Sequence, residues 1–321
     1  MYKKTLTNNY LSIKVSTNSK RIMTLLDNFL DSGVTASLKP KISIQFNLEE
    51  HSPVKPGDSK QALYQNWIAR DNTLVSSFGS TMATATVNPK KGLVDAVVSD
   101  YQASFKEATL DFIFVKPLHF ILAHHGLFFI HASVVCKGSN CVLINGPQNS
   151  GKSTIALTLG RNGFGLLTDD DCFAKSFGNK ARLFPFPTKM GLNDKIIKKY
   201  PEFRAHLLND YRYGNKQRLP LNTVGNGRTG IKTLTCTTIL FPAYRPKGRT
   251  RVKKISRAKA LNRLARESSF LNAFYPAEQI KKIQNENFWA LYNLTRNARA
   301  YELQYNDKEL DNIPGMITKI F

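Results

Sequence analysis

The segment from Cys141 to Asp171 constrains this chain more than any other part of it. It reads CVLINGPQNSGKSTIALTLGRNGFGLLTDDD and places Gly146, Gly151, Lys152 and Ser153 at the fixed positions of G-x-x-x-x-G-K-[ST]. Glycines let consecutive backbone N–H groups turn toward phosphate oxygens, and the positive end of the following helix attracts the same oxygens. We therefore expect a nucleotide-phosphate site formed by Gly146, Pro147, Gln148, Asn149, Ser150, Gly151, Lys152, Ser153 and Thr154.

The sequence around this loop provides the context that the pattern requires. Val142–Ile144 is a short apolar run typical of a buried strand, and Thr154–Arg161 contains helix formers without proline. Asn162-Gly163 then predicts the end of that helix. In this setting Lys152 would reach the β- and γ-phosphates and Ser153 would ligate Mg²⁺. The alternative is a glycine turn with a purely structural role.

Two carboxylates follow the loop helix at close range. Asp169 comes 17 residues after Lys152, which leaves room for one helix and one short strand, Leu166–Thr168. Asp169 and Asp170 would then lie at the carboxyl end of that strand, where open α/β sheets bind ligands. One of the two can order Mg²⁺ while the other accepts a proton from an attacking hydroxyl. Side chains alternate along a strand, so only one of the pair need face the phosphates. The alternative is a solvated acidic turn.

Charge is the dominant feature of the composition. The 321 residues carry 46 Lys and Arg against 23 Asp and Glu, a net charge of +23, which favours anionic partners or simply reflects a lysine-rich surface. Arg245–Arg266 holds ten of these cations and no acid, and within it Ala258, Leu261, Leu264 and Ala265 predict an amphipathic helix. This segment contains no aromatic residue, which argues against nucleic acid as its partner.

The cysteines and histidines offer no paired metal spacing. Three of the four cysteines lie in or beside apolar, strand-like sequence, which predicts free buried thiols and a cytoplasmic location. Four of the six histidines fall between His119 and His131, but without zinc spacing or neighbouring acids. His131 is interpreted either as a core histidine or as part of the catalytic site. The uncharged run Pro117–Cys136 contains proline, glycine and these histidines, so we expect a buried helix and strand rather than a membrane span.

The chain is long enough for about two domains. Residues 1–111 predict a small α+β accessory region, with strands at Lys41–Asn47, Thr73–Phe78, Thr81–Val87 and Leu93–Val98 and a loop at His51–Ser59. Residues 112–321 are expected to form an α/β P-loop domain. In that domain, the polar and glycine-rich Asn222–Gly230 is a candidate lid.

Three stretches together resemble the C-terminal kinase domain of HPr kinase/phosphorylase, a P-loop fold similar to phosphoenolpyruvate carboxykinase. They are Ile130–Val135 followed by Gly138, the GPQNSGKST loop, and GFGLLTDDD. The likeness is closer to HPr-kinase-related proteins, since true HPr kinases tend to place a glutamate where this chain has Thr154.

This resemblance implies a catalytic group of Lys152, His131, Asp169 and Asp170. In it, His131 lies near the transferred phosphate, Asp169 acts as the general base, and Asp170 assists with metal or substrate, so that the metal-side residues are Ser153 and Asp170. The downstream glutamate and arginine-glycine signature of HPr kinases is not visible, which favours an acceptor other than HPr and puts the reverse phosphorylase reaction in doubt.

The leading prediction is an HPr-kinase-like phosphotransferase that uses ATP and Mg²⁺ to phosphorylate a hydroxyl. The acceptor would be a protein serine or a small molecule, and a homo-oligomer is left open. A regulatory ATP-binding module without its own acceptor is the alternative. A nucleic-acid-associated P-loop ATPase, suggested only by the charge, comes third.

Overall fold

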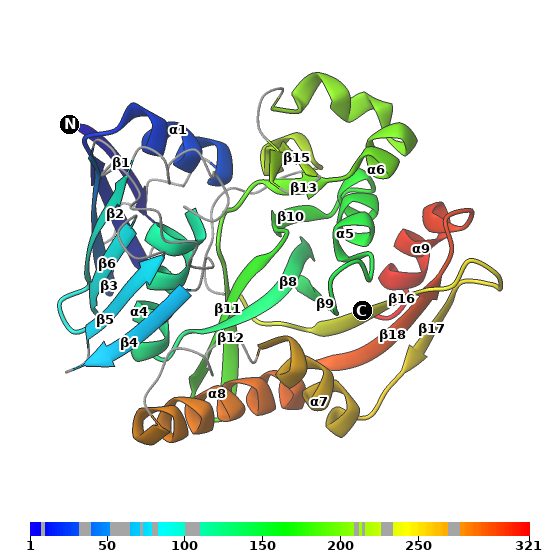
Figure 1. The fold of residues 1–321 in the computed structure, drawn as a ribbon. Coiled ribbons are helices and arrows are strands. Elements are labelled where there is room, and N and C mark those ends of the chain that lie inside the picture. The colour runs from blue at the N-terminus through cyan, green and yellow to red at the C-terminus, as the bar shows by residue number, and fades with distance from the viewer. Residues whose placement is uncertain are drawn as a thin grey trace. The chain divides into compact units, whose positions relative to one another are not determined.

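The computed structural model describes residues 1–7, 10–31, 40–51, 65–70, 73–78, 83–99, 110–208, 212–213, 216–225, 234–268 and 277–321 (Figure 1). Contacts divide the chain into two compact units. The first is Met1–Leu127 with Leu271–Gln284, and the second is Phe128–Phe270 with Asn285–Phe321. Residues 112–127, expected in the P-loop domain, group with the first unit because a π-helical turn at Asp111–Val115 and helix α4 (Lys116–His124) contact its strand β6.

The first unit is built on a seven-stranded mixed sheet in the order β1-β2-β3-β7-β6-β5-β4. Helix α1 (Lys20–Phe29) connects β2 to β3, which run parallel, and the Ser19 side chain caps it by accepting from the N–H of Ile22. The strands are β1 (Tyr2–Thr7), β2 (Leu11–Thr17), β3 (Ile42–His51), β4 (Gln65–Arg70), β5 (Thr73–Phe78), β6 (Ala83–Asn88) and β7 (Leu93–Ser99).

Several expectations for this region are confirmed as elements. The alternating sequence around residues 42–47 forms β3, in which buried and exposed side chains alternate as its pattern predicts. The expected strands near residues 73, 81 and 93 correspond to β5, β6 and β7. The predicted loop after His51 lies outside the described residues.

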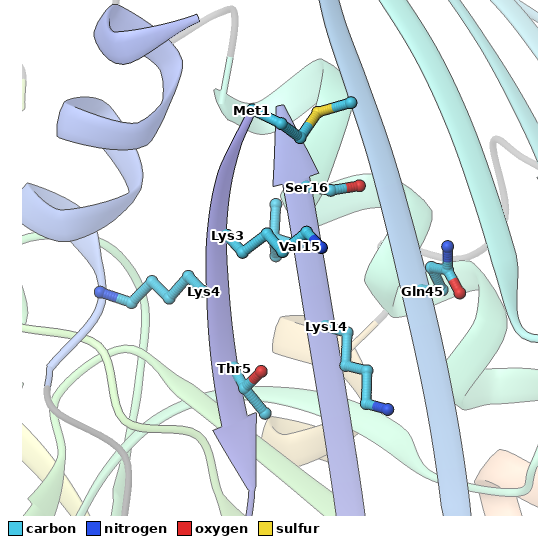
Figure 2. A pocket seen from close by; sticks show the side chains of 8 residues that line it. All are labelled: Met1, Lys3, Lys4, Thr5, Lys14, Val15, Ser16 and Gln45. Carbon is cyan, nitrogen blue, oxygen red and sulfur yellow. The ribbon is translucent and has the colours of Figure 1, made fainter. Parts of the chain in front are cut away.

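A pocket of about 540 Å³ opens on the first unit (Figure 2). Its lining comes from β1, β2 and β3 and consists of Met1, Lys3, Lys4, Thr5, Lys14, Val15, Ser16 and Gln45. These side chains include three lysines and no carboxylate, histidine or cysteine.

The second unit contains a larger mixed sheet in the order β12-β11-β8-β9-β16-β18-β17, with β10 paired to β8. Strands β9, β16 and β18 run parallel, and β8, β10, β11, β12 and β17 join antiparallel. The sheet strands are β8 (Phe128–Lys137), β9 (Asn140–Asn145), β10 (Gly165–Thr168), β11 (Asp171–Phe177), β12 (Lys180–Pro185), β16 (Thr238–Tyr244), β17 (Arg251–Lys254) and β18 (Arg299–Tyr305).

A second, three-stranded sheet in this unit has the order β13-β15-β14, with β13 (Met190–Leu192), β14 (Arg212–Tyr213) and β15 (Lys216–Leu219). The helices are α5 (Lys152–Arg161), α6 (Asp194–Lys199), α7 (Arg257–Ser268), α8 (Ala277–Asn297), which begins in the first unit, and α9 (Ile313–Thr318). Short 3-10 helices occupy Pro201–His206, Leu221–Thr223 and Leu310–Asn312.

Two hydrophobic clusters pack against the large sheet. One contains Ile144 of β9, Ile155 and Leu159 of α5 and Leu303 of β18. The other contains Leu143 of β9, which points to the opposite side, together with residues of α7 and α8. Because β9 is buried on both sides, its apolar run is continuous, as the sequence predicted for the strand before the loop.

The predicted cationic helix is present as α7, but its buried face differs from the expected one. Ala260, Leu264 and Ser268 are buried, whereas Ala258 and Ala265 are exposed. Because α7 has few apolar side chains, the sequence pattern did not determine which side of the helix faces the core. The candidate lid Asn222–Gly230 is described only as far as residue 225. Its remaining residues, which include Arg228, lie outside the described part of the chain.

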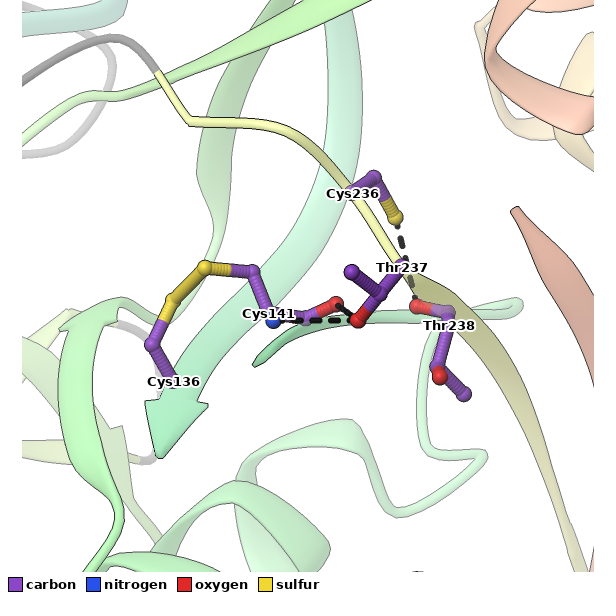
Figure 3. The surroundings of a disulfide bond; sticks show 5 residues. All are labelled: Cys136, Cys141, Cys236, Thr237 and Thr238. Atoms are coloured by element: carbon purple, nitrogen blue, oxygen red, sulfur yellow. Dashed lines mark hydrogen bonds between the residues drawn. A yellow bond between two sulfur atoms is a disulfide. The ribbon is translucent and has the colours of Figure 1, made fainter. Parts of the chain in front are cut away.

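The expectation of four free thiols is wrong for two of them. Cys136 and Cys141 form a disulfide across the β8–β9 turn, with Cα atoms 4.2 Å apart (Figure 3). The two residues are directly opposite in the ladder, and the N–H and C=O of Cys141 bond to Thr237 instead. Such a non-hydrogen-bonded pair brings side chains close together. Cys172 and Cys236 are free and buried, as expected. Only Cys172 and Cys236 therefore match the free thiols that favoured a cytoplasmic location.

The uncharged run from Pro117 forms a buried helix and then a strand, α4 and β8, as predicted. Among the residues that the structure describes, no helix has the length and apolar character needed to cross a membrane.

Candidate active site

The glycine-rich loop connects β9 to α5 in a backbone conformation that requires glycine at one position. Gly151 has φ = 97°, and a Cβ atom built there would lie 1.7 Å from Tyr305 Oη. Tyr305 ends β18 and its hydroxyl donates to the carbonyl of Ser150 at 3.3 Å. Asn149 also has a positive φ of 63°, which asparagine tolerates. The second glycine of the pattern is therefore fixed both by its dihedral angle and by a neighbour from a distant strand.

Lys152 lies inside this loop. Its side chain is only 6% exposed, and Nζ donates to the carbonyls of Gly146 at 2.8 Å and Pro147 at 3.1 Å. Burial lowers the pKa of Lys152, while the charges of Asp170 and Asp169 raise it in compensation. The loop thus encloses an ammonium group beside two carboxylates at the first turn of α5.

Asp169 and Asp170 lie where β8 changes partner. Strand β8 pairs with β10 through Val134–Cys136 and with β11 through Phe128–His131, and the two aspartates span the gap between. The β10 register shifts at Leu167, so β10 and β11 do not form one regular strand. Adjacent side chains of an extended segment point to opposite sides, so the two carboxylates have different neighbours.

Asp169 is fully buried and its carboxylate accepts hydrogen bonds from three elements. Ser133 Oγ of β8 donates to Oδ1 at 2.9 Å, while Oδ2 accepts from Ser153 Oγ at 3.0 Å and from the N–H of Gly191 at 3.2 Å. Burial and the neighbouring charge of Asp170 raise the pKa of Asp169 to about 6, against the opposing influence of Lys216 and the two serine hydroxyls.

Asp170 lies next to His131 instead. The distance from His131 Nε2 to Asp170 Oδ1 is 3.6 Å, and both side chains are partly exposed. Burial, followed by the charge of Lys152, lowers the pKa of His131, so the imidazole is neutral near pH 7 and the contact is polar rather than ionic. Burial opposes ionisation of Asp170, but His131 and the cations Lys216 and Arg218 hold its pKa below the usual value.

Two of these cations were not singled out from the sequence. Lys216 and Arg218 lie on β15, which pairs with β13, the strand that carries Gly191. Arg218 is 3% exposed and its Nη1 donates to the carbonyl of Lys189 at 2.8 Å. The charge of Lys216 acts on Asp169, Asp170, His131 and Lys152 alike. The spacing of Lys216 and Arg218 could have indicated that they act at one site, because residues i and i+2 of a strand lie on the same face.

The structure therefore brings the predicted residues together in two groups. Lys152, Ser153 and Asp169 form one, and His131 and Asp170 form the other. Ser153 contacts Asp169 and not Asp170, which differs from the pairing that the resemblance implied. Within the described part of the chain, no group of three or more His, Cys, Asp or Glu side chains is placed to hold a metal ion by itself.

Comparison with solved structures finds the Hpr(Ser) kinase/phosphatase from Coxiella burnetii, with a TM-score of 0.27 and 12% sequence identity. The match covers 59% of this chain and 90% of that chain. No protein-family model matches the chain, and no curated protein matches it. A likeness at this level assigns neither an activity nor a substrate.

Proposed function

We propose that this protein transfers the γ-phosphoryl group of ATP to a hydroxyl group, with the assistance of Mg²⁺. The observation that carries the proposal is the direct contact of Ser153 with Asp169 beside the buried Lys152. It joins the two halves of the sequence pattern, the glycine-rich loop and the carboxylate pair, at the carboxyl end of β9. Ligands of α/β sheets bind at such ends.

The residues present fit both a nucleotide and a magnesium ion. Ser153 Oγ and Asp169 Oδ2 are 3.0 Å apart, and hydroxyl and carboxylate oxygens are the ligands that Mg²⁺ takes. Lys152 has three N–H donors that can exchange carbonyl oxygens of the loop for phosphate oxygens. When bound, Mg²⁺ would neutralise negative charge on the β- and γ-phosphates.

The contacts favour a division of roles opposite to that expected from the resemblance. Asp169 is fully buried and both of its oxygens accept hydrogen bonds, so it is suited to hold the metal beside Ser153. A neighbouring cation would also stabilise its ionised form despite the raised pKa. Asp170 is partly exposed and ionised, so it is suited to accept the proton of the incoming hydroxyl, with the neutral His131 beside it.

In the step that follows, the acceptor oxygen forms a bond to the γ-phosphorus and the bond from that phosphorus to the β–γ bridging oxygen breaks. The hydroxyl proton passes to Asp170, and ADP leaves with the charge formed on its terminal phosphate. Lys152 and Lys216 place positive charge near these groups, and catalysis arises chiefly from positioning and charge neutralisation. The acceptor is proposed to be a protein serine, on the resemblance to HPr-kinase-related proteins, or a small hydroxyl compound.

Incubation with γ-labelled ATP and Mg²⁺, with and without cell extract, tests this proposal. We expect a labelled product that is lost with Lys152→Ala because the phosphates are no longer held. Asp170→Asn should retain ATP binding and lose transfer, whereas Asp169→Asn should weaken the dependence on Mg²⁺. Tight ATP binding without transfer to any acceptor would reject the kinase and leave a regulatory ATP-binding module.

A further inference from the structure

The cationic segment Arg245–Arg266 is a feature of the chain that the proposed function does not use. It covers the loop after β16, strand β17 at the end of the large sheet, and most of helix α7 (Figure 1). Of its ten Lys and Arg side chains, nine are exposed and Arg263 is half-buried. The register of β17 and the ion pairs of α7 decide which of these cations share one surface.

Strand β17 points Arg251 and Lys253 to the side of the sheet that α7 covers. Lys253 is opposite Glu302 of β18 in the antiparallel pairing, and Arg251 lies two residues before it. Opposed residues of paired strands, and residues two apart in one strand, lie on the same face. Val252, between the two cations, packs against the hydrophobic cluster on the α5 side, so its neighbours point to the α7 side.

Helix α7 brings further cations to Glu302. Arg263 donates to the Glu302 carboxylate, and Lys259 Nζ lies 4.0 Å from it. Arg266 is three residues after Arg263, so these three cations share one side of the helix. Although it is paired, the Lys259 side chain is 54% exposed and can contact a partner. We define the cationic flank as Arg251, Lys253, Lys259, Arg263 and Arg266.

The cationic flank leads toward the candidate active site. Helix α7 packs on β8, the strand that carries His131. Burial lowers the pKa of Lys152, and the charge of Glu267, which directly follows Arg266, is among those that raise it. Lys259 and Arg266 are seven positions apart, or about 10 Å along the helix axis. A short extended segment bound along the flank would therefore end close to the proposed catalytic groups.

We propose that the phosphoryl acceptor is an acidic protein segment that binds along the cationic flank and presents a serine hydroxyl to Asp170. This inference rests on the proposed function and narrows its acceptor to a protein. Arginine holds a carboxylate through two parallel hydrogen bonds, and exposed lysines add attraction without a fixed geometry. The net charge of +23 also favours encounter with an acidic partner.

Nucleic acid and anionic lipid carry the same charge but fit this surface less well. None of the residues from 245 to 266 is aromatic, so bases would find no ring to stack on within the segment. The five side chains of the cationic flank include no apolar group that could insert into lipid, so a membrane would be held by charge alone. An acidic protein that carries the acceptor serine also accounts for the course of the flank toward Lys152.

Fluorescence anisotropy with two labelled peptides, one of repeated Glu-Glu-Ser and one of repeated Gln-Gln-Ser, tests the docking. The acidic peptide should bind with an affinity that falls as salt is added, and it should accept label from γ-labelled ATP. Arg251→Gln, Lys253→Gln and Lys259→Gln together should weaken binding about tenfold, or about twofold for each cation, because exposed ion pairs are weak. Transfer to the peptide should fall in parallel, while the affinity for ATP stays unchanged.

Lys180→Gln, Lys198→Gln and Lys319→Gln together are the matched control, because they remove three exposed cations from β12, α6 and the end of α9 in the same unit. This control should leave peptide affinity and transfer nearly unchanged. Thermal melting verifies that both triple variants are folded. Equal binding of the two peptides, or an equal loss in the two triple variants, would overturn the inference.

The labelling pattern separates this inference from the proposed function. Label on the Gln-Gln-Ser peptide as strong as on the acidic one would reject the docking surface and leave the kinase intact. Absence of label from every peptide and every extract protein would reject phosphoryl transfer itself, and the acceptor with it. Binding to phosphatidylserine vesicles without binding to the acidic peptide would also contradict the inference and identify a lipid surface instead.

Discussion

Replacing Asp169 by asparagine should change how the stability of the protein depends on pH. In the folded protein, burial and the charge of Asp170 raise the pKa of Asp169 to about 6, against 3.8 for an ordinary aspartate. The folded protein therefore retains a proton between these two pH values that the unfolded chain releases. Stability falls with rising pH wherever the folded state binds more protons.

The size of the effect follows from the two pKa values. Their difference corresponds to a total loss of about 3 kcal/mol in the free energy of unfolding, of which about 2 kcal/mol falls between pH 4 and pH 7. Asparagine has nearly the same shape as the protonated acid and cannot lose a proton in this range. The free energy of unfolding of Asp169→Asn, minus that of the wild type, should thus increase by about 2 kcal/mol from pH 4 to pH 7.

Urea unfolding followed by circular dichroism, in buffers without nucleotide or Mg²⁺, measures this difference at each pH. Asp170→Asn is the informative companion, because removing its charge lowers the pKa of Asp169 and should move the same transition to lower pH. A difference between Asp169→Asn and wild type that stays constant from pH 4 to pH 7 would refute the reasoning, because burial would then not hold a proton on this carboxyl.

Three further predictions concern Gly151 of the loop, the Cys136–Cys141 disulfide and the Lys216 side chain. Gly151→Ala should destabilise the protein by about 1–3 kcal/mol in thermal melts and weaken ATP binding, whereas Gly178→Ala, whose Cβ would have open space, should cost less. Thiol titration of the unfolded, unreduced chain should find only Cys172 and Cys236, and removing the disulfide by Cys136→Ser should cost about 2 kcal/mol; four reactive thiols would contradict the pairing. Lys216→Gln should slow phosphoryl transfer by about a hundredfold with little change in ATP affinity, and an unchanged rate would exclude Lys216 from the site.

The elements around the loop could be predicted because their signals are local. Each signal acts within a few residues. The apolar run before Gly146 forms β9, and α5 begins with the helix formers near Ser153 and ends before Asn162-Gly163, as predicted. The carboxylates at the end of β10 were also placed correctly, since the distance from Lys152 left room for one helix and one strand only.

The finer geometry of the site depends on contacts that no local pattern contains. The partner of Ser153 is decided by the register shift in β10, where one residue changes which aspartate faces the loop. Lys216 reaches the site only because β15 pairs with β13. The disulfide also depends on register, because Cys136 and Cys141 are directly opposite each other only in the pairing that β8 and β9 adopt.

Titration calorimetry with ATP, in the presence and absence of Mg²⁺, tests the central claim most directly. We predict Mg²⁺-dependent binding by the wild-type protein, loss of binding in Lys152→Ala, and retention of binding in Asp170→Asn. Binding that survives Lys152→Ala, or that shows no dependence on Mg²⁺ in the wild type, would contradict the assignment of the loop and of the Ser153–Asp169 pair.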